Sequence, residues 1–468
     1  MNKKNFAPDP GELKKVAVNS IEKNGDICLS LDLNREMPKM RPMHGVTNFA
    51  PLQNSAMTCN YPLLTMVRDL KIPYSYFHDT PLENPGLDLI DVSRIFPIFS
   101  ADVNNPENYR FAETDAYLQQ VIDSGTEVIF RLGESIEVTP AKRFRVNPPA
   151  DFEKWAEICL HIVSHYTEGW ANGFRWNIRD WAVWEEPNNP NLWGGTFEQY
   201  LRLYEVTAVK FKKRFPNLRI GGPESTTFGI KYLEQFLAFC EEKKLPLDFV
   251  CYTAYYQTPA EILAESFVRR KMVDDHGFKD IPLWMDEWHG SPLWDSFPDE
   301  VGYMRESNRI RGYNGAVFAG TVLCGLQDVP AERACYYSVC MPGGYGLFDE
   351  RRIPTPQYYM FAKYCSMFNN AKRRVAVDFV DDEPNVKALA CEIDEANIEM
   401  MLGCYLQNAR TIKFSIPDGF KLKSVEVMNA NNARFVELNS WDYSVADNVA
   451  TLQKNELPMA FFVKLQKI

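Results

Sequence analysis

The segment WAVWEEPNNPNLWGG, from Trp181 to Gly195, changes character part-way along its length. It begins as an apolar run and ends in a Pro- and Asn-rich stretch that is typical of a loop. Two adjacent carboxylates, Glu185 and Glu186, lie at the junction. An apolar strand that delivers a carboxylate at its C-terminal end is how a (β/α)8 barrel presents a catalytic residue. The segment therefore predicts such a barrel, with an active site after this strand.

A second segment of the same kind, IPLWMDEWH, ends at His289 and carries Glu287 after its apolar run. Two carboxylates that flank a glycosidic bond can cleave it, because one protonates the leaving oxygen while the other attacks the anomeric carbon or activates water. By strand count, Glu186 closes the fourth barrel strand and Glu287 the seventh, across the mouth from each other. A gap of roughly 5 Å between them would fit a retaining mechanism.

Short apolar runs alternate with longer amphipathic segments through the middle of the chain, the rhythm of a parallel sheet with helices outside. The expected strands are MHGVTNF (43–49), SYFHD (75–79), FPIFS (96–100), EVIFRLG (127–133), IRDWAVWEE (178–186), LRIGGP (218–223), DFVCYTAYY (248–256), IPLWMDEW (281–288) and ACYYSV (334–339). The expected helices are 115–124, 151–167, 196–214, 230–244 and 305–327. Eight or nine strands over this length fit an α/β fold of the (β/α)8 TIM-barrel type with long loops.

Three parts follow from these patterns. Residues 371–468 are short alternating segments separated by turns such as PDG and NANN, which predicts a C-terminal β-sandwich domain. Residues 37–370 form the catalytic barrel. Residues 1–36 are an N-terminal arm and a hairpin signalled by Asn24-Gly25, which we expect to join the sandwich.

The composition of the chain limits which binding partners and cofactors are expected. The net charge of -11 argues against nucleic acid and anionic membrane, whereas a neutral oligosaccharide substrate is compatible with it. No HExxH, P-loop, GxGxxG or GxSxG motif occurs, so neither a metal nor a cofactor is expected. The 11 cysteines form no CxxC pair, and no apolar leader follows the basic N-terminus. These features predict a cytoplasmic protein, with a processed periplasmic form and a homo-oligomer left open.

Tryptophans cluster near both carboxylates. Eight of the ten lie in two windows, 170–193 and 284–294. Sugar rings stack their apolar faces on aromatic planes, so Trp184, Trp193 and Trp288 are candidate substrate-binding residues. A place in the hydrophobic core is the alternative for each.

WAVWEEPNNPNLW resembles the W-x-x-W-N-E-P-N-x-x-x-F-W motif of retaining glycoside hydrolases of clan A, most closely those of family 39, which includes β-xylosidases and α-L-iduronidase. MDEWH resembles the nucleophile motif of that family. RIGGPES, DFVCYTAY and GGYGLFDERRIPTPQYYMF are similar to family elements in the family order, so the resemblance covers most of residues 40–368. It implies a barrel with a β-sandwich and a cofactor-free retaining exo-glycosidase. Such an enzyme would cleave plant-type oligosaccharides by double displacement, as β-xylosidases do.

The resemblance also implies roles for the carboxylates. Glu186 is similar to the family's general acid/base, and Glu287 to the nucleophile that forms the glycosyl-enzyme intermediate. Burial beside Trp184 and repulsion from Glu287 would raise the pKa of Glu186, so that it holds a proton near neutral pH.

Further substrate-binding candidates surround this pair. Tyr255 is similar to the tyrosine that hydrogen-bonds the nucleophile, and His78 to a histidine at the barrel mouth. His289 and Tyr345 lie in the matching motifs. For both histidines, a structural hydrogen bond is the alternative.

Three departures from the family pattern concern specificity. Glu185 stands where the family has an asparagine that donates to the sugar 2-hydroxyl, and an ionised glutamate can only accept. It could accept from that hydroxyl or meet a cationic group. Thr253 replaces a family histidine, and the segment after the last strand, ACYYSVCMPGGYGL, lacks an acidic pair. A family 39 enzyme of other specificity, such as an arabinosidase, and a catalytically impaired glycan-binding barrel are therefore the alternatives.

Overall fold

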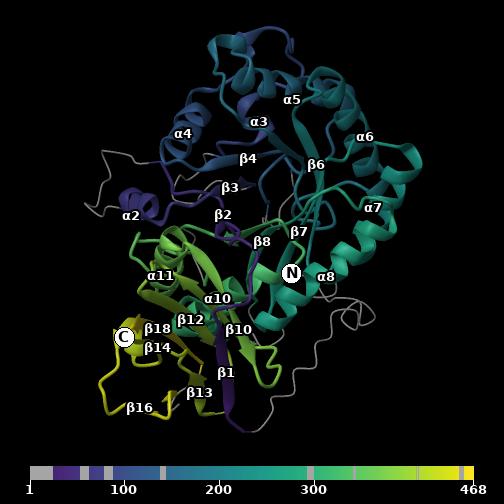
Figure 1. The fold of residues 1–468 in the computed structure, drawn as a ribbon. Coiled ribbons are helices and arrows are strands. Elements are labelled where there is room, and N and C mark those ends of the chain that lie inside the picture. Colours follow the sequence, from purple (N-terminus) through teal and green to yellow (C-terminus); the bar gives the residue numbers. More distant parts are fainter. Residues whose placement is uncertain are drawn as a thin grey trace.

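The computed structural model describes residues 25–52, 63–78, 88–137, 144–291, 300–340, 344–406, 408, 410–452 and 458–468. These residues form a closed barrel of eight parallel strands and a ten-stranded mixed sheet that curls into a second, smaller unit (Figure 1). The predicted (β/α)8 barrel with a C-terminal β-sandwich is confirmed.

The barrel strands follow one another in chain order and close where β2 pairs with β9. They are β2 (Gly45–Thr47), β3 (Tyr74–Phe77), β4 (Glu127–Leu132), β5 (Asp180–Val183), β6 (Arg219–Ser225), β7 (Phe249–Tyr256), β8 (Leu283–Gly290) and β9 (Arg333–Tyr337). Buried side chains from several strands, among them Tyr74, Phe249 and Trp284, pack together inside the barrel. The interior is therefore a filled core, and a site can open only at its ends.

The run FPIFS is not a ninth barrel strand, contrary to expectation. The short helix α3 (Val92–Ile95) ends at Phe96, and Pro97 follows. Proline has no N–H to give to a ladder of backbone hydrogen bonds, so this run is poorly suited to a central strand. Each of the other eight predicted runs supplies one barrel strand.

Helices surround the barrel (Figure 1). After α3 come α4 (Ala112–Asp123), α5 (Phe152–Thr167), α6 (Phe197–Arg214), α7 (Ile230–Lys243), α8 (Pro259–Asp275), α9 (Glu300–Arg311), α10 (Tyr313–Gly325) and α11 (Pro356–Asn370), with α2 (Leu63–Leu70) before it. Short 3-10 turns cover Pro106–Asn108, Trp170–Asn172 and Leu326–Asp328. Thr196 and Gln199 form a capping box at the start of α6.

The predicted helix 305–327 is two helices. Gly312 between them is extended, with φ -81° and ψ -165°, and a Cβ at this position would lie 2.9 Å from the Asn308 backbone oxygen. The two pieces also differ in environment, because α9 carries many charged residues whereas α10 is buried along nearly its whole length.

The ten-stranded sheet combines the C-terminal region with one early strand. Its order is β15-β14-β18-β12-β11-β10-β1-β13-β17-β16. The strands are β1 (Ile27–Asp32), β10 (Arg373–Phe379), β11 (Val386–Glu392), β12 (Asn397–Cys404), β13 (Ile412–Ser415), β14 (Phe420–Asn429), β15 (Asn432–Glu437), β16 (Tyr443–Ala446), β17 (Val449–Leu452) and β18 (Met459–Lys467). β1 runs antiparallel to β10 and parallel to β13. The first arm of the predicted hairpin lies outside the described residues, and the boundaries at 36 and 370 stay a prediction.

The two faces of β12 belong to different cores. Met400 and Leu402 pack inside the curled sheet, whereas Met401 packs with the barrel core. This alternation follows from the two-residue period of a strand. Gly403 on the same strand lies against Thr321 of α10, so this helix joins the two units.

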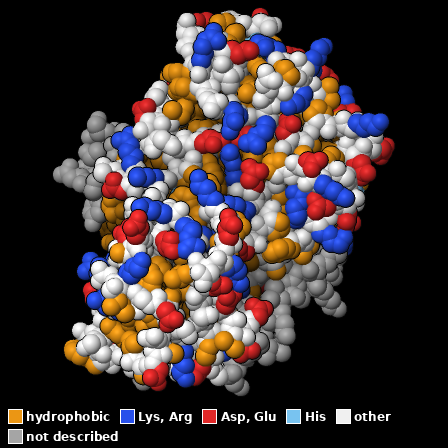
Figure 2. All heavy atoms as spheres, viewed as in Figure 1, with side chains coloured by type: hydrophobic (Ala, Val, Ile, Leu, Met, Phe, Trp, Pro, Cys, Tyr) orange, Lys and Arg blue, Asp and Glu red, His pale blue; other side chains and the backbone are white. Residues whose placement is uncertain are grey.

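Charge is spread over the surface. On the face shown in Figure 2, Lys and Arg side chains are interspersed with Asp and Glu. Within the described ranges, no helix is long and apolar enough to cross a membrane.

We expect Gly403→Ala to destabilise the protein at the junction of its two units. A Cβ on Gly403 would lie 2.8 Å from the Thr321 Cα, so β12 or α10 must shift. Overpacking of this kind costs about 1–3 kcal/mol. Urea unfolding of the variant checks this, with Ser444→Ala on the exposed strand β16 as the control. Equal midpoints for Gly403→Ala and the parent would contradict the packing described.

Candidate active site

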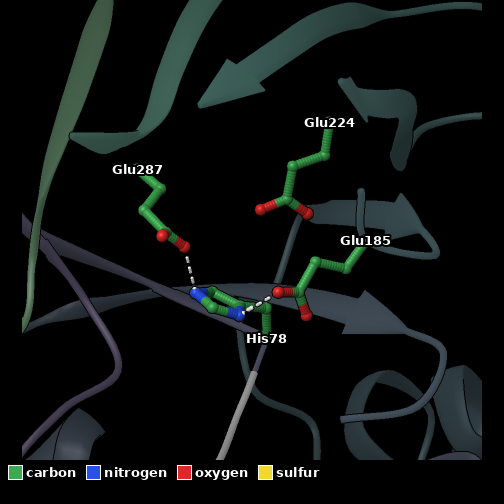
Figure 3. A group of neighbouring side chains, drawn as sticks. All are labelled: His78, Glu185, Glu224 and Glu287. Atoms are coloured by element: carbon green, nitrogen blue, oxygen red, sulfur yellow. Dashed lines mark ion pairs between the residues drawn. The ribbon is translucent and has the colours of Figure 1, made fainter. Parts of the chain in front are cut away.

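Four buried side chains meet where the carboxyl ends of the barrel strands come together (Figure 3). His78 follows β3, Glu185 follows β5, Glu224 lies in β6 and Glu287 lies in β8. Their ligating atoms all lie within 4.8 Å of one another. The structure thus joins residues that the sequence singled out separately, and it adds Glu224, which the sequence had not singled out.

The turn after β5 sends the two adjacent carboxylates in different directions. Trp184 and Glu186 have φ of 64° and 35°, in the left-handed region that non-glycine residues rarely occupy. Two backbone hydrogen bonds hold the turn: Trp184 donates to Leu132 at 2.8 Å, and Asn189 donates to Glu186 at 2.7 Å. This strained geometry is characteristic of functional sites. Glu185 and Glu186 consequently have different partners.

Glu186 lies in an environment suited to a proton donor. Asn189 Nδ2 and Thr253 Oγ1 each donate to its carboxylate at 2.9 Å. Burial raises its pKa to about 7, and the charge of Glu287 adds to this rise, while the two hydrogen bonds and His78 oppose it. Direction and cause agree with the sequence-based expectation. Thr253, a departure from the family pattern, thus contacts the expected acid/base directly.

Glu287 is held through both carboxylate oxygens. The Tyr255 hydroxyl donates to Oε1, and His78 Nε2 forms an ion pair with Oε2. An irregularity in the strand pairing helps to aim it: Tyr252 is opposite Met285 and Thr253 is opposite Glu287, so Asp286 is skipped. Such a bulge re-aims side chains near active sites.

His78 stands between two carboxylates. Its Nδ1 forms an ion pair with Glu185, as Nε2 does with Glu287 (Figure 3). The ring stacks on Tyr337 with centroids 5.7 Å apart, and its backbone N–H donates to Asn48. The imidazole is therefore fixed in position and in orientation.

Arg131 is a second buried cation near this site. Its Nε lies 3.7 Å from Glu185 Oε2, and its guanidinium forms an ion pair with Asp91 at 3.2 Å. The side chain is fully buried. The sequence did not single it out, although an arginine inside the apolar strand EVIFRL was a signal, because such a residue is almost never buried without partners.

Glu224 of this cluster and the neighbouring Asp286 are two further buried carboxyl groups. Burial raises the pKa of Glu224 well above its ordinary range, and the charges of Asp286 and Glu185 add to the rise. Burial likewise raises the pKa of Asp286 to about 8. Tyr76 donates to Glu224 at 2.7 Å. The raised pKa values favour the protonated forms of these two groups.

The cluster of His78, Glu185, Glu224 and Glu287 offers nitrogen and oxygen atoms of the kinds that bind metal ions. A histidine ligand must present a neutral ring nitrogen with a free electron pair. Here each ring nitrogen of His78 faces a carboxylate. That arrangement fits an imidazolium better than a metal ligand.

The three candidate tryptophans lie in the hydrophobic core. Trp184 and Trp193 pack edge to face at 4.9 Å, and Trp288 packs against Tyr336 at 5.1 Å. None is more than 4% exposed. The structure therefore places them beneath the site, and their burial favours the core alternative over stacking on a sugar.

His289 and Tyr345 lie next to each other, near Tyr255. His289 Nε2 contacts the Tyr336 hydroxyl at 2.8 Å, and burial lowers the histidine pKa to about 4, which leaves it neutral. These contacts fit the structural alternative for His289. The Tyr345 ring stands edge-on to His289 at 4.8 Å and to Tyr255 at 6.0 Å, so Tyr345 lies next to the tyrosine that holds Glu287.

The sequence model of glycosyl hydrolases family 39 matches residues 89–402. The chain belongs to this family. A β-xylosidase of Geobacillus stearothermophilus is 30% identical over 242 residues, which cover 46% of this chain and 46% of that protein. A β-xylosidase of Caldicellulosiruptor saccharolyticus is 23% identical over 310 residues, 59% of this chain and 56% of that protein. The chain thus spans about half the length of these curated relatives.

A solved structure shows the same fold. A glucosidase from Croceicoccus marinus superposes with a TM-score of 0.72 at 19% identity, covering 95% of this chain and 100% of that one. At this identity the likeness concerns the architecture alone.

The Glu186 carboxyl should make stability depend on pH. Because its pKa rises from 4.5 unfolded to about 7 folded, the folded state binds more protons between these values, and the free energy of unfolding falls as pH rises through them. Glu186→Gln has no carboxyl to titrate at this position, so its free energy of unfolding does not fall for this reason as pH rises. The variant should gain about 1–3 kcal/mol relative to the parent between pH 4.5 and pH 8.

Unfolding by urea at several pH values measures this difference, and site groups common to both proteins cancel. Glu234→Gln, on the exposed face of α7, is the control and should show no such trend. A constant difference for Glu186→Gln across the range would mean that the Glu186 carboxyl titrates normally.

Proposed function

We propose that this chain is a retaining glycosidase in which Glu287 is the nucleophile and Glu186 the general acid/base. One observation carries the proposal: two carboxylates at the ends of β5 and β8 are prepared for opposite tasks. Burial makes Glu186 a proton carrier with a pKa of about 7, whereas two donors hold the oxygens of Glu287. A division of this kind between two carboxyl groups assigns acid and nucleophile.

In the first step, a Glu287 oxygen attacks the anomeric carbon, and the bond to the leaving oxygen breaks. The proton of Glu186 passes to that oxygen, so the aglycone leaves as an alcohol. In the second step, Glu186, now a carboxylate, takes a proton from water as the water oxygen attacks the same carbon. The ester bond to Glu287 breaks, and both carboxyl groups return to their starting states.

The electrostatic coupling of the two groups supports this cycle. The charge of Glu287 is one cause of the raised pKa of Glu186. When Glu287 becomes an ester, that charge disappears and the pKa of Glu186 falls. The same side chain is thus an acid while Glu287 is free and a base while Glu287 is esterified.

The proposed substrates are plant-type oligosaccharides from which a terminal sugar is removed, as the names of the two β-xylosidase relatives suggest. Tyr345, beside Tyr255, is a candidate contact for that sugar. The segment ACYYSVCMPGGYGL, which begins in β9 and continues past it, lacks the acidic pair of family β-xylosidases, and this favours a second candidate, the same mechanism on another sugar such as arabinose.

A panel of aryl glycosides, with the matching activated 2-fluoro sugars, tests both the reaction and the sugar. We expect turnover of at least one glycoside and a covalent adduct on Glu287, found by mass spectrometry of peptides. Glu287→Gln should form no adduct. Binding of glycans without turnover of any of them would instead support an impaired, glycan-binding barrel.

Activity on poor leaving groups should fall as pH rises through about 7, because Glu186 must be protonated in the first step. Asn189→Ala and Thr253→Val each remove a hydrogen bond that lowers this pKa. We expect each variant to shift the basic limb of the pH profile of kcat/KM to higher pH by about one unit. Asn188→Ala is the matched control, because Asn188 contacts Thr226 instead. An unmoved limb in both variants would argue against Glu186 as the acid.

A further inference from the structure

Glu185, His78 and Glu287 form a continuous line of contacts across the barrel mouth (Figure 3). The line begins after β5, crosses the residue after β3 and ends in β8. Glu185 is 2% exposed and His78 is 2% exposed, so water can compete little with these contacts. Glu185 is thus linked to the proposed nucleophile through the imidazole.

Several carboxyl groups surround His78, and their charge states differ. Glu224 from β6, Asp286 from β8 and Glu186 after β5 all interact electrostatically with it. Their pKa values are raised by burial, to about 7 for Glu186, about 8 for Asp286 and well above the ordinary range for Glu224. Glu185 and Glu287 are the two carboxyl groups that touch the imidazole nitrogens.

We propose that Glu185 is a positioning residue that holds His78 as an imidazolium with Nε2 aimed at the nucleophile. Two carboxylates on the two ring nitrogens favour the doubly protonated ring, since an opposite charge at contact distance stabilises the charged form. An asparagine at position 185 would supply no such charge. The inference rests on the proposed function, because it assigns a role within the same site.

The line of contacts from Glu185 through His78 to Glu287, which we call the relay, acts mainly on the second chemical step. When the ester to Glu287 breaks, negative charge returns to a carboxylate that faces a fixed cation, and this stabilises the transition state in which the charge develops. In the first step the same cation stabilises the negative charge of the Glu287 carboxylate, which is lost as the ester forms. The cation therefore does not accelerate that step. Glu185 in place of asparagine is then a working part of this site.

Nitrogen NMR of the 15N-histidine-labelled protein measures the protonation of the His78 ring nitrogens directly. His78→Gln identifies the His78 signals among those of the six histidines. In the parent, we expect both His78 nitrogens to be protonated at pH 7. In Glu185→Gln the ring should lose a proton at a pH lower by about one to three units.

Kinetics give the second readout. With an aryl glycoside of a very good leaving group, Glu185→Gln and Glu185→Asn should slow deglycosylation at least about tenfold, which one ion-pair contact can account for. Glycosylation should change less, so a burst of released phenol should appear. The matched control is Glu134→Gln, a buried carboxyl that accepts from Ser93. Burial raises its pKa well above the ordinary range, so glutamine replaces a neutral group.

The outcomes separate the two proposals. An unchanged His78 signal in Glu185→Gln, or equal slowing by Glu134→Gln, would overturn the relay. So would loss of parent activity on chelation with recovery on adding zinc or calcium, because His78 would then be a metal ligand. If the parent hydrolyses no glycoside, the proposed function fails, while the histidine signals still decide whether Glu185 holds the imidazolium.

Discussion

Five carboxyl groups gather at the mouth of the barrel: Glu185, Glu224, Asp286 and Glu287 are buried, and Glu186 is half-buried. They cannot all be ionised there, because taking one charge out of water costs roughly several kcal/mol unless a partner compensates it. The site meets this constraint in two ways. Burial raises the pKa of three of the groups, and the imidazole of His78 and the guanidinium of Arg131 lie beside the other two.

This division of charge organises the proposed chemistry. Glu186 lies where a proton can be held and released near neutral pH, and the Glu287 carboxyl lies between Tyr255 and His78. The departures from the family pattern belong to the same arrangement. Thr253 donates to Glu186, and Glu185 faces His78, so each substituted residue has a defined partner.

The fold supplies the precision that this arrangement needs. A filled barrel interior and a bulge at Asp286 set the height and direction of Glu287. The left-handed residues Trp184 and Glu186 separate two side chains that are adjacent in sequence. Buried tryptophans stiffen the same turn: the Trp184 indole donates to the Leu192 carbonyl at 2.7 Å. These tryptophans thus serve the scaffold.

Much of this architecture could be predicted from local patterns. Eight apolar runs became the eight barrel strands, and the carboxylates at the ends of β5 and β8 were found because a strand's end is visible in its own sequence. The predictions of a strand at FPIFS and of one helix over 305–327 were wrong for equally local reasons. Pro97 and Gly312 interrupt the element that the surrounding apolar pattern suggests.

The sequence by itself determined the barrel, the sandwich and the two carboxylates at the ends of β5 and β8, because each depends on residues that are neighbours in the chain. Only the tertiary structure showed that Glu185 faces His78, that Arg131 and Glu224 lie close to it, and that the three tryptophans pack in the hydrophobic core. Those outcomes depend on which strands meet when the barrel closes. His78 and Glu287 are far apart in sequence, and only that closure brings the imidazole against the carboxylate.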